Sequence, residues 1–170
     1  MKTVKSICAL LIVAMCSCSE KAANVDENAA QTEVNAQEPL PVIEAKALTS
    51  EPGVVFYDMP LEDALLKAKH EGKYVLIDCH TKTCGPCRRM ETEIFPQEQL
   101  GKFVNERFVP IMSDMEEGEG LEIAEKYNVQ IFPTLLVLLP NGAREGEVMG
   151  AEFNLDILIG MLKTIIHENC

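Results

Sequence analysis

Two cysteines, Cys84 and Cys87, are separated by two residues and follow an apolar segment, residues 74–79, that is typical of a buried central strand. A helix is predicted directly after them, through about residue 93. The first thiol then lies at a helix N-terminus, where unpaired N–H groups and the helix dipole stabilise a thiolate. Such a position lowers the pKa of a thiol from about 8.5 to roughly 3.5–7.5. The pair can therefore cycle between dithiol and disulfide, with Cys84 as nucleophile and Cys87 resolving the mixed disulfide.

The two residues between the cysteines suit this use. Gly85 permits a tight entry into the helix, and Pro86 lies in the first turn, where no helical hydrogen bond is lost. A structural zinc site usually has four ligands, and the chain has no second Cys-x-x-Cys and no His-x-x-x-His, so we expect no metal here. A purely structural disulfide across so short a loop would add little stability. A structural zinc site and a structural disulfide are therefore the less favoured interpretations of the Cys-x-x-Cys spacing.

Composition limits the classes of function. The chain has 170 residues and is 47% apolar, which is enough for one domain with a substantial core and some additional length. Its 15 basic and 27 acidic residues give a net charge of −12, which argues against binding phosphates, so we expect no nucleic-acid partner. The seven cysteines are an odd number and have to be assigned one by one.

Residues 1–18 are predicted to be an export signal. Lys2 and Lys5 precede a short apolar run over residues 7–15, whereas a membrane-spanning helix needs roughly 20 apolar residues. The end of the run resembles a bacterial lipoprotein signal, in which the cysteine after the cleavage site is acylated. Cys18 is the preferred lipid attachment site because it follows a small residue, with Cys16 as the alternative. An ordinary secreted protein with two incidental thiols is the other interpretation.

The remainder of the chain divides into a tether and a domain. Residues 19–52 are rich in Ala, Asn, Gln and Glu without a sustained apolar period, which predicts a flexible acidic tether. Residues 53–170 are the predicted folded domain, in which Cys79 is assigned to the core and Cys170 to a polar tail. Its strands and helices alternate and end with a hairpin and a helix, so we expect an α/β fold with a mixed sheet. Strands are predicted over 54–57, 74–79, 108–112, 134–139 and 147–149, and helices over 61–71, 84–93, 99–105, 121–127 and 155–167.

Several short motifs resemble the thioredoxin superfamily in order and spacing over residues 54–168. The helix at 61–71 and the segment 89–96 are more similar to exported interchange domains, such as the C-terminal domain of the DsbD reductase, than to a minimal thioredoxin. The resemblance implies a thioredoxin-like fold with a mixed central sheet flanked by helices. It is carried by Val75-Leu76-Ile77-Asp78, Cys84-Gly85-Pro86-Cys87-Arg88, Tyr127-Asn128-Val129, Phe132-Pro133-Thr134, Asn141-Gly142 and Gly150-Ala151.

The resemblance also implies roles for individual residues. Cys84 is the attacking and Cys87 the resolving cysteine, and Asp78 is the buried acid whose raised pKa suits it to accept the proton of Cys87. Pro133 is a cis-proline facing the pair, and the backbone of Phe132 pairs with the substrate. The expected substrate surface is completed by Thr83, Gly85 and Pro86.

Three departures from the family pattern concern the site. Thr83 stands where a tryptophan usually precedes the first cysteine, and His80 replaces another common aromatic residue. Met112 stands where a lysine often accompanies the buried acid, so the coupling between Asp78 and Cys87 is expected to differ. His80 is interpreted as a polar residue at the edge of the site rather than as a base.

The sequence therefore predicts a thiol–disulfide oxidoreductase that reduces protein disulfides and needs no cofactor beyond its redox-active cysteine pair. It is expected to be a monomer on the periplasmic side of a bacterial membrane, touching the membrane only through its lipid anchor. A membrane thiol reductant of the interchange type would restore the dithiol. The alternatives are an oxidase or isomerase of the same compartment, and a non-catalytic module that binds a metal or a partner.

Overall fold

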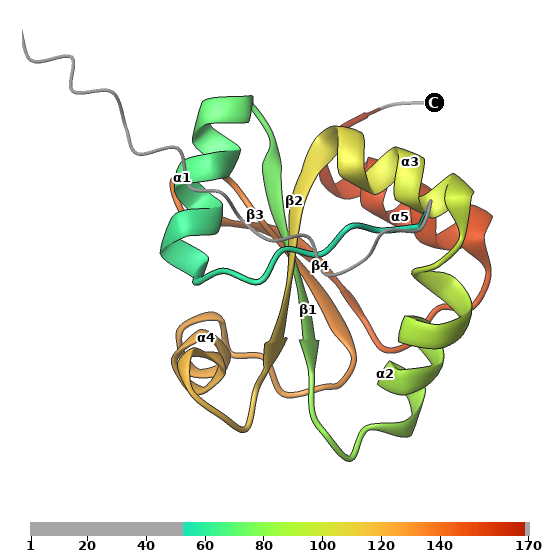
Figure 1. Ribbon diagram of the computed structural model, residues 1–170, viewed down its shortest axis with the longest axis horizontal. Helices are drawn as coiled ribbons and strands as arrows, with labels where there is room; N and C mark the ends of the chain where they lie inside the picture. Colours follow the sequence, from blue (N-terminus) through green and yellow to red (C-terminus); the bar gives the residue numbers. More distant parts are fainter. Residues whose placement is uncertain (1–52, 169–170) are drawn as a thin grey trace, which may run out of the picture. The chain divides into compact units, whose positions relative to one another are not determined.

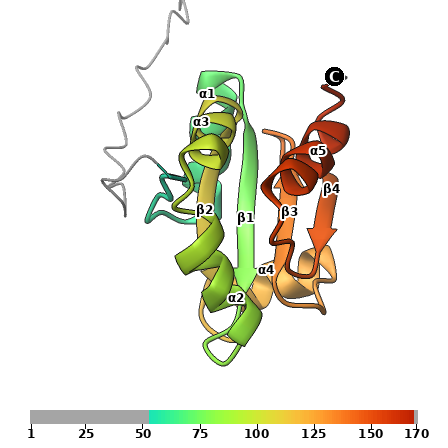
Figure 2. The same cartoon turned by 90° about the vertical axis from the view of Figure 1, so that its right-hand side faces the viewer.

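The computed structural model describes residues 53–168, which form an α/β fold around one mixed sheet. The sheet has the order β2-β1-β3-β4; β1 and β2 are parallel, whereas β3 is antiparallel to both of its neighbours (Figure 2). The predicted mixed sheet is confirmed. The strands are β1 (Tyr74–His80), β2 (Phe108–Asp114), β3 (Thr134–Leu138) and β4 (Arg144–Met149).

Helices cover both faces of the sheet (Figure 1). One face carries α1 (Leu61–Glu71) and α4 (Glu119–Tyr127), whose apolar sides join one core cluster. The other face carries α2, a π-helical segment η1 that continues it, α3 and α5. Their bounds are α2 (Gly85–Arg89), η1 (Met90–Ile94), α3 (Glu98–Arg107) and α5 (Leu155–Ile165).

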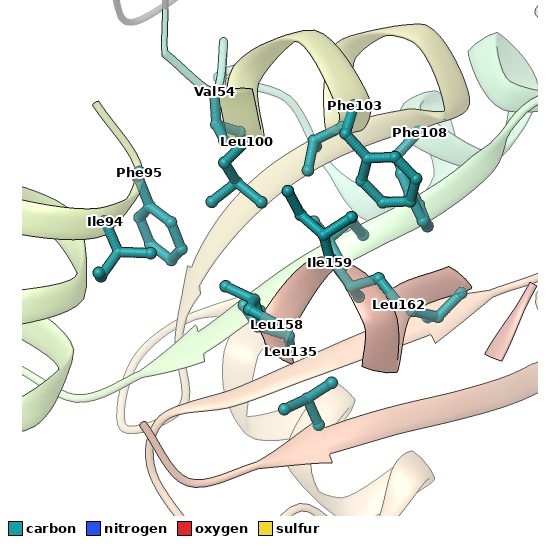
Figure 3. Close-up of a cluster of buried hydrophobic side chains, with 14 of the residues drawn as sticks. Val54, Ile94, Phe95, Leu100, Phe103, Phe108, Leu135, Leu158, Ile159 and Leu162 are labelled. Atoms are coloured by element: carbon teal, nitrogen blue, oxygen red, sulfur yellow. The ribbon is translucent and has the colours of Figure 1, made fainter. Parts of the chain in front are cut away.

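Strand β1 lies between two cores because successive side chains of a strand point to opposite faces. Leu76 belongs to the core under α3 and α5, whereas Val75 and Ile77 belong to the core under α1 and α4. Figure 3 shows how side chains from η1, α3 and α5 converge on the first of these cores. Burial on both faces explains why the sequence of β1 is almost continuously apolar.

Residues 54–57 do not form the predicted strand. The N–H of Val54 donates to the carbonyl of Phe95 at 2.8 Å, and that of Val55 donates to the Asn105 side chain at 2.9 Å. These two donors therefore bind the end of η1 and helix α3 rather than a neighbouring strand. Only Tyr57 makes a bridge to the sheet, beside Ile111 of β2. The predicted strand over 54–57 is therefore wrong, because most of its backbone hydrogen bonds go to segments outside the sheet.

Other boundaries differ from the predictions by a few residues. Strand β4 begins at Arg144 rather than at residue 147, and α4 begins at Glu119 rather than at residue 121. Helix α5 ends at Ile165, two residues before the predicted end. The predicted signal, tether and lipid site, as well as Cys170, lie outside the described residues. Between residues 53 and 168, none of the helices has the length and apolar character that crossing a membrane requires.

Two helical glycines should respond in opposite ways to alanine. A Cβ on Gly120 would lie 1.8 Å from the backbone oxygen of Asp114, whereas a Cβ on Gly160 meets nothing within 4 Å. We expect Gly120→Ala to lower the free energy of unfolding by about 1–3 kcal/mol. Gly160→Ala should raise it by about 0.5–1 kcal/mol. Urea denaturation of both variants checks this, and equal effects would contradict the packing at Gly120.

Candidate active site

The cysteine pair lies where the chain passes from β1 into α2, beyond the carboxyl end of β1 (Figure 2). The Cys84 N–H donates to the carbonyl of Thr81 at 3.1 Å, which closes the turn between strand and helix. Cys84 is the N-cap of α2, with extended backbone, and Pro86 lies in the first turn as predicted. Cys84 and Cys87 form a disulfide with their Cα atoms 5.3 Å apart.

The two sulfurs differ in accessibility. Cys84 is half-buried, whereas Cys87 is only 2% exposed. Around Cys84 the side chains of Thr83 and Pro86 and the backbone of Gly85 are exposed. The N–H of Cys87 donates to Sγ of Cys84 at 3.2 Å, and the same amide would stabilise a thiolate there. An external sulfur can therefore reach Cys84 before it reaches Cys87.

A cis peptide bond precedes Pro133, as the family resemblance implies. Because β3 runs antiparallel to β1, Thr134 pairs with Cys79, and the start of β3 lies at the same end of the sheet as the cysteine loop. The carbonyl of Pro133 accepts a 2.8 Å hydrogen bond from the N–H of Gly150. The backbone of Phe132, which is predicted to bind the substrate, thus lies at the same end of the sheet as the cysteines.

Two exposed apolar side chains flank this proline, and the sequence analysis missed them. Ile131 is 52% exposed, and Met149, which pairs with Thr134 across β3 and β4, is 62% exposed. Large apolar side chains with this exposure are common at contact surfaces. The sequence could have pointed to Ile131, because it lies next to the Phe132–Pro133 bond. The position of Met149 near the proline follows only from the pairing of β3 with β4.

Asp78 is buried on the face of β1 that α2 and η1 cover. Its neighbours across the sheet are Met112 and Leu135, and the residue is 1% exposed. Neither carboxylate oxygen has a hydrogen-bond partner within the described part of the chain. Burial, and to a smaller extent the nearby charge of Glu91, together raise the pKa of Asp78 to about 7. The predicted upward shift is confirmed.

His80 and Glu91 accompany this buried acid. His80 Nδ1 lies 3.6 Å from Asp78 Oδ2 and 3.3 Å from the Asp78 carbonyl oxygen. A carboxylate oxygen of Glu91 lies within 4.8 Å of both side-chain atoms. His80 was predicted to lie at the edge of the site, but Glu91 was missed. The available signal was its position four residues, about one helical turn, after Cys87.

Cys79 lies on the opposite face of β1 from Asp78. It is fully buried in the core under α1 and α4, and burial raises its pKa to about 12. A thiol with that pKa is not a nucleophile at neutral pH. The assignment of Cys79 to the core is confirmed.

A family model, a sequence relative and a solved structure all relate this chain to thioredoxin-like proteins. The family described as "Thioredoxin-like domain" matches residues 61–165. A thioredoxin H-type from Oryza sativa subsp. indica is 40% identical over 87 residues, which are 51% of this chain and 66% of that protein. The solution structure of a candidate disulphide-isomerase from Bacteroides thetaiotaomicron is 32% identical, with a TM-score of 0.63, over 72% of this chain and 100% of that one.

The DsbD C-terminal domain of Neisseria meningitidis has the same fold. In its oxidised form it aligns with a TM-score of 0.51 and 23% identity, covering 61% of this chain and 91% of that domain. The predicted similarity to this domain is confirmed at the level of the fold. The chain spans about two thirds of the length of the rice relative.

Asp78 should make folding stability depend on pH. In the unfolded chain its carboxyl ionises near the ordinary pKa of 3.8, whereas in the folded protein it keeps its proton up to about pH 7. Between these values only the unfolded state releases the proton, so the stability contributed by this group falls as pH rises and levels off above about 7. Asp78→Asn should therefore gain stability over the wild type by up to about 1.4 kcal/mol per pH unit across this range.

Urea denaturation between pH 4 and pH 8, in the presence of a chelator, measures that difference. The exposed Asp58, changed to Asn, is the matched control and should show no such trend. A difference between Asp78→Asn and wild type that stays constant with pH would contradict the shifted pKa.

Proposed function

Because the chain belongs to the thioredoxin-like family, we propose that it is a thiol–disulfide oxidoreductase that reduces disulfides of exported proteins through Cys84 and Cys87. One observation carries the proposal: a Cys-Gly-Pro-Cys pair lies at a strand-to-helix junction with its first sulfur accessible and its second buried. The pair itself carries two electrons, so the reaction needs no further cofactor.

The reaction begins with the dithiol form. The Cys84 thiolate attacks one sulfur of the substrate disulfide, a new S–S bond forms, and the other substrate sulfur leaves as a thiolate that takes up a proton. Cys87 then loses its proton and attacks Sγ of Cys84, which releases the second substrate thiolate. The substrate gains two electrons, and Cys84 and Cys87 end as the disulfide seen in the structure.

Asp78 is proposed to accept the proton of Cys87. Its carboxyl has the raised pKa of about 7 that matches proton transfer at neutral pH, and it lies within 4.8 Å of Glu91, which follows Cys87 by about one helical turn. No lysine occupies the neighbouring position of β2, where Met112 pairs with Asp78. The carboxylate formed above pH 7 is therefore not neutralised there, which favours its role as a base.

The substrate is proposed to bind as an extended segment across the cis-proline. The backbone of Phe132 would hydrogen-bond to it, and the exposed side chains of Ile131 and Met149 would contact its apolar residues. Thr83 leaves the approach to Cys84 less enclosed than a tryptophan would. This arrangement supports protein disulfides as the substrate class.

Insulin-disulfide reduction tests the assignment. Cys84→Ser and Cys87→Ser should each reduce the rate by at least about 100-fold, because either one lacks a sulfur of the cycle. Cys87→Ser should also accumulate a mixed disulfide at Cys84, visible by mass spectrometry. Cys79→Ala is the control and should retain the rate. Equal rates for wild type and both serine variants would refute the proposal.

The direction of electron flow is a separate part of the proposal, because oxidases and isomerases use the same pair. Reductants of this type have reduction potentials of about −270 mV, whereas strong oxidants have reduction potentials of about −120 mV. We expect the Cys84–Cys87 couple to lie closer to the first value when equilibrated with glutathione. A value near the second would favour the oxidase.

Export, lipid anchoring at Cys18 and renewal of the dithiol by a membrane thiol reductant complete the proposal. The similarity to an interchange-protein domain supports the reductant, and the sequence of residues 1–18 supports export. Mass spectrometry of the mature protein should find an acylated Cys18 at the N-terminus, and Cys18→Ser should shift the protein from the membrane to the soluble fraction. An unmodified N-terminus would contradict the anchor.

A further inference from the structure

Three side chains that are typical metal ligands converge behind the cysteine pair. Asp78 and His80 come from one face of β1, and Glu91 comes from η1, which packs on that face. We propose that Asp78, His80 and Glu91 form a binding site for one divalent transition-metal ion of the zinc type. The sequence analysis weighed a metal site at the cysteines, and the site proposed here uses neither of them.

The spacing of the ligand atoms suits such an ion. The three atoms lie within 4.8 Å of one another, and His80 Nδ1 lies 3.6 Å from Asp78 Oδ2. Bonds of about 2.0–2.2 Å in a tetrahedral site separate neighbouring ligand atoms by roughly 3.4 Å. The Asp78–His80 pair is already close to that separation. The Glu91 carboxylate, at the end of a flexible side chain, has to move by no more than about 1.4 Å, and water would supply the fourth ligand.

The state of Asp78 is an independent indication that a ligand belongs here. Buried polar groups almost always have hydrogen-bond partners, yet both oxygens of this carboxyl lack one among residues 53–168, and the residue is 1% exposed. Oδ2 lies 3.6 Å from His80 Nδ1, which is too long for a hydrogen bond and forms an ion pair only when the imidazole is protonated. A metal ion between them would satisfy an acceptor that has no hydrogen-bond partner among the described residues.

Charge points to a cation of charge two. In the described part of the chain, no lysine or arginine forms an ion pair with Asp78 or Glu91, and Met112 lies beside Asp78 in β2. Two carboxylates and a neutral imidazole carry two negative charges, which one divalent ion neutralises. An imidazole with two carboxylates favours zinc and its neighbours, whereas calcium and magnesium prefer all-oxygen sites.

An ion also has a route to the site. Glu91 lines a cavity of about 260 Å³ that opens to solvent, together with Met112 and Phe56. The His80 side chain is 19% exposed, so the ligand set is reached from outside without unfolding. Binding would occupy Asp78 and withdraw it from the proton transfer described above; this consequence rests on the proposed function, whereas the site itself does not.

Titration calorimetry with Zn²⁺ on the oxidised full chain tests the site, because the disulfide then removes Cys84 and Cys87 as ligands. We expect one ion to bind through these side chains, and Asp78→Asn, His80→Ala and Glu91→Gln each to weaken that binding by at least about tenfold. His70→Ala and Glu93→Gln are the controls and should bind as the wild type does. His70 is exposed on α1. Glu93 lies two residues after Glu91 and forms an ion pair with Arg89.

Cobalt provides a second measurement. The visible spectrum of Co²⁺ bound to the oxidised chain should lack a thiolate charge-transfer band and should disappear in His80→Gln, which retains a polar side chain of similar size. Circular dichroism confirms that each variant is folded. Failure of Zn²⁺ to bind, or binding left unchanged by all three ligand substitutions, would overturn the proposal. Neither result would bear on insulin reduction, so this failure is distinguishable from failure of the reductase.

Discussion

Strand β1 is covered on both faces, and the rest of the structure depends on this burial. Side chains alternate along a strand, so Ile77 and Cys79 enter the core under α1 and α4, while Asp78 must point into the opposite core beneath α2 and η1. A carboxyl is thereby held without solvent. The same strand leads through a short turn into α2, and this connection places the cysteines beyond the buried acid.

The two proposed roles of Asp78, proton transfer and metal binding, both depend on the electrostatic environment of its carboxyl group. Desolvation keeps the carboxyl protonated up to about pH 7, and Met112, rather than a lysine, at the paired position of β2 leaves the ionised form able to accept either a proton or a cation. Glu91 and His80 are close enough to influence both events. Replacement of the usual lysine by Met112 is therefore a change in electrostatics as much as in packing.

Reactivity and recognition come from different parts of the chain. The α2 terminus gives Cys84 its position and an N–H donor, while Ile131 and the cis bond before Pro133 lie in the segment that precedes β3, and Met149 ends β4. The antiparallel pairing of β1 with β3 brings these segments to one end of the sheet. Covalent chemistry and substrate contact can therefore change separately.

The sequence by itself determined what depends on local spacing: the Cys-x-x-Cys pair at a strand-to-helix junction, the buried β1 and the mixed α/β fold. Turn residues and hydrophobic periodicity act over a few neighbours, so these features are legible along the chain. Only the tertiary structure decided that Val54 and Val55 bond to helical segments, that Met149 lies beside the cis-proline, and that Glu91 meets Asp78 and His80. These depend on strand register and helix packing, which join residues distant in sequence and which no local pattern specifies.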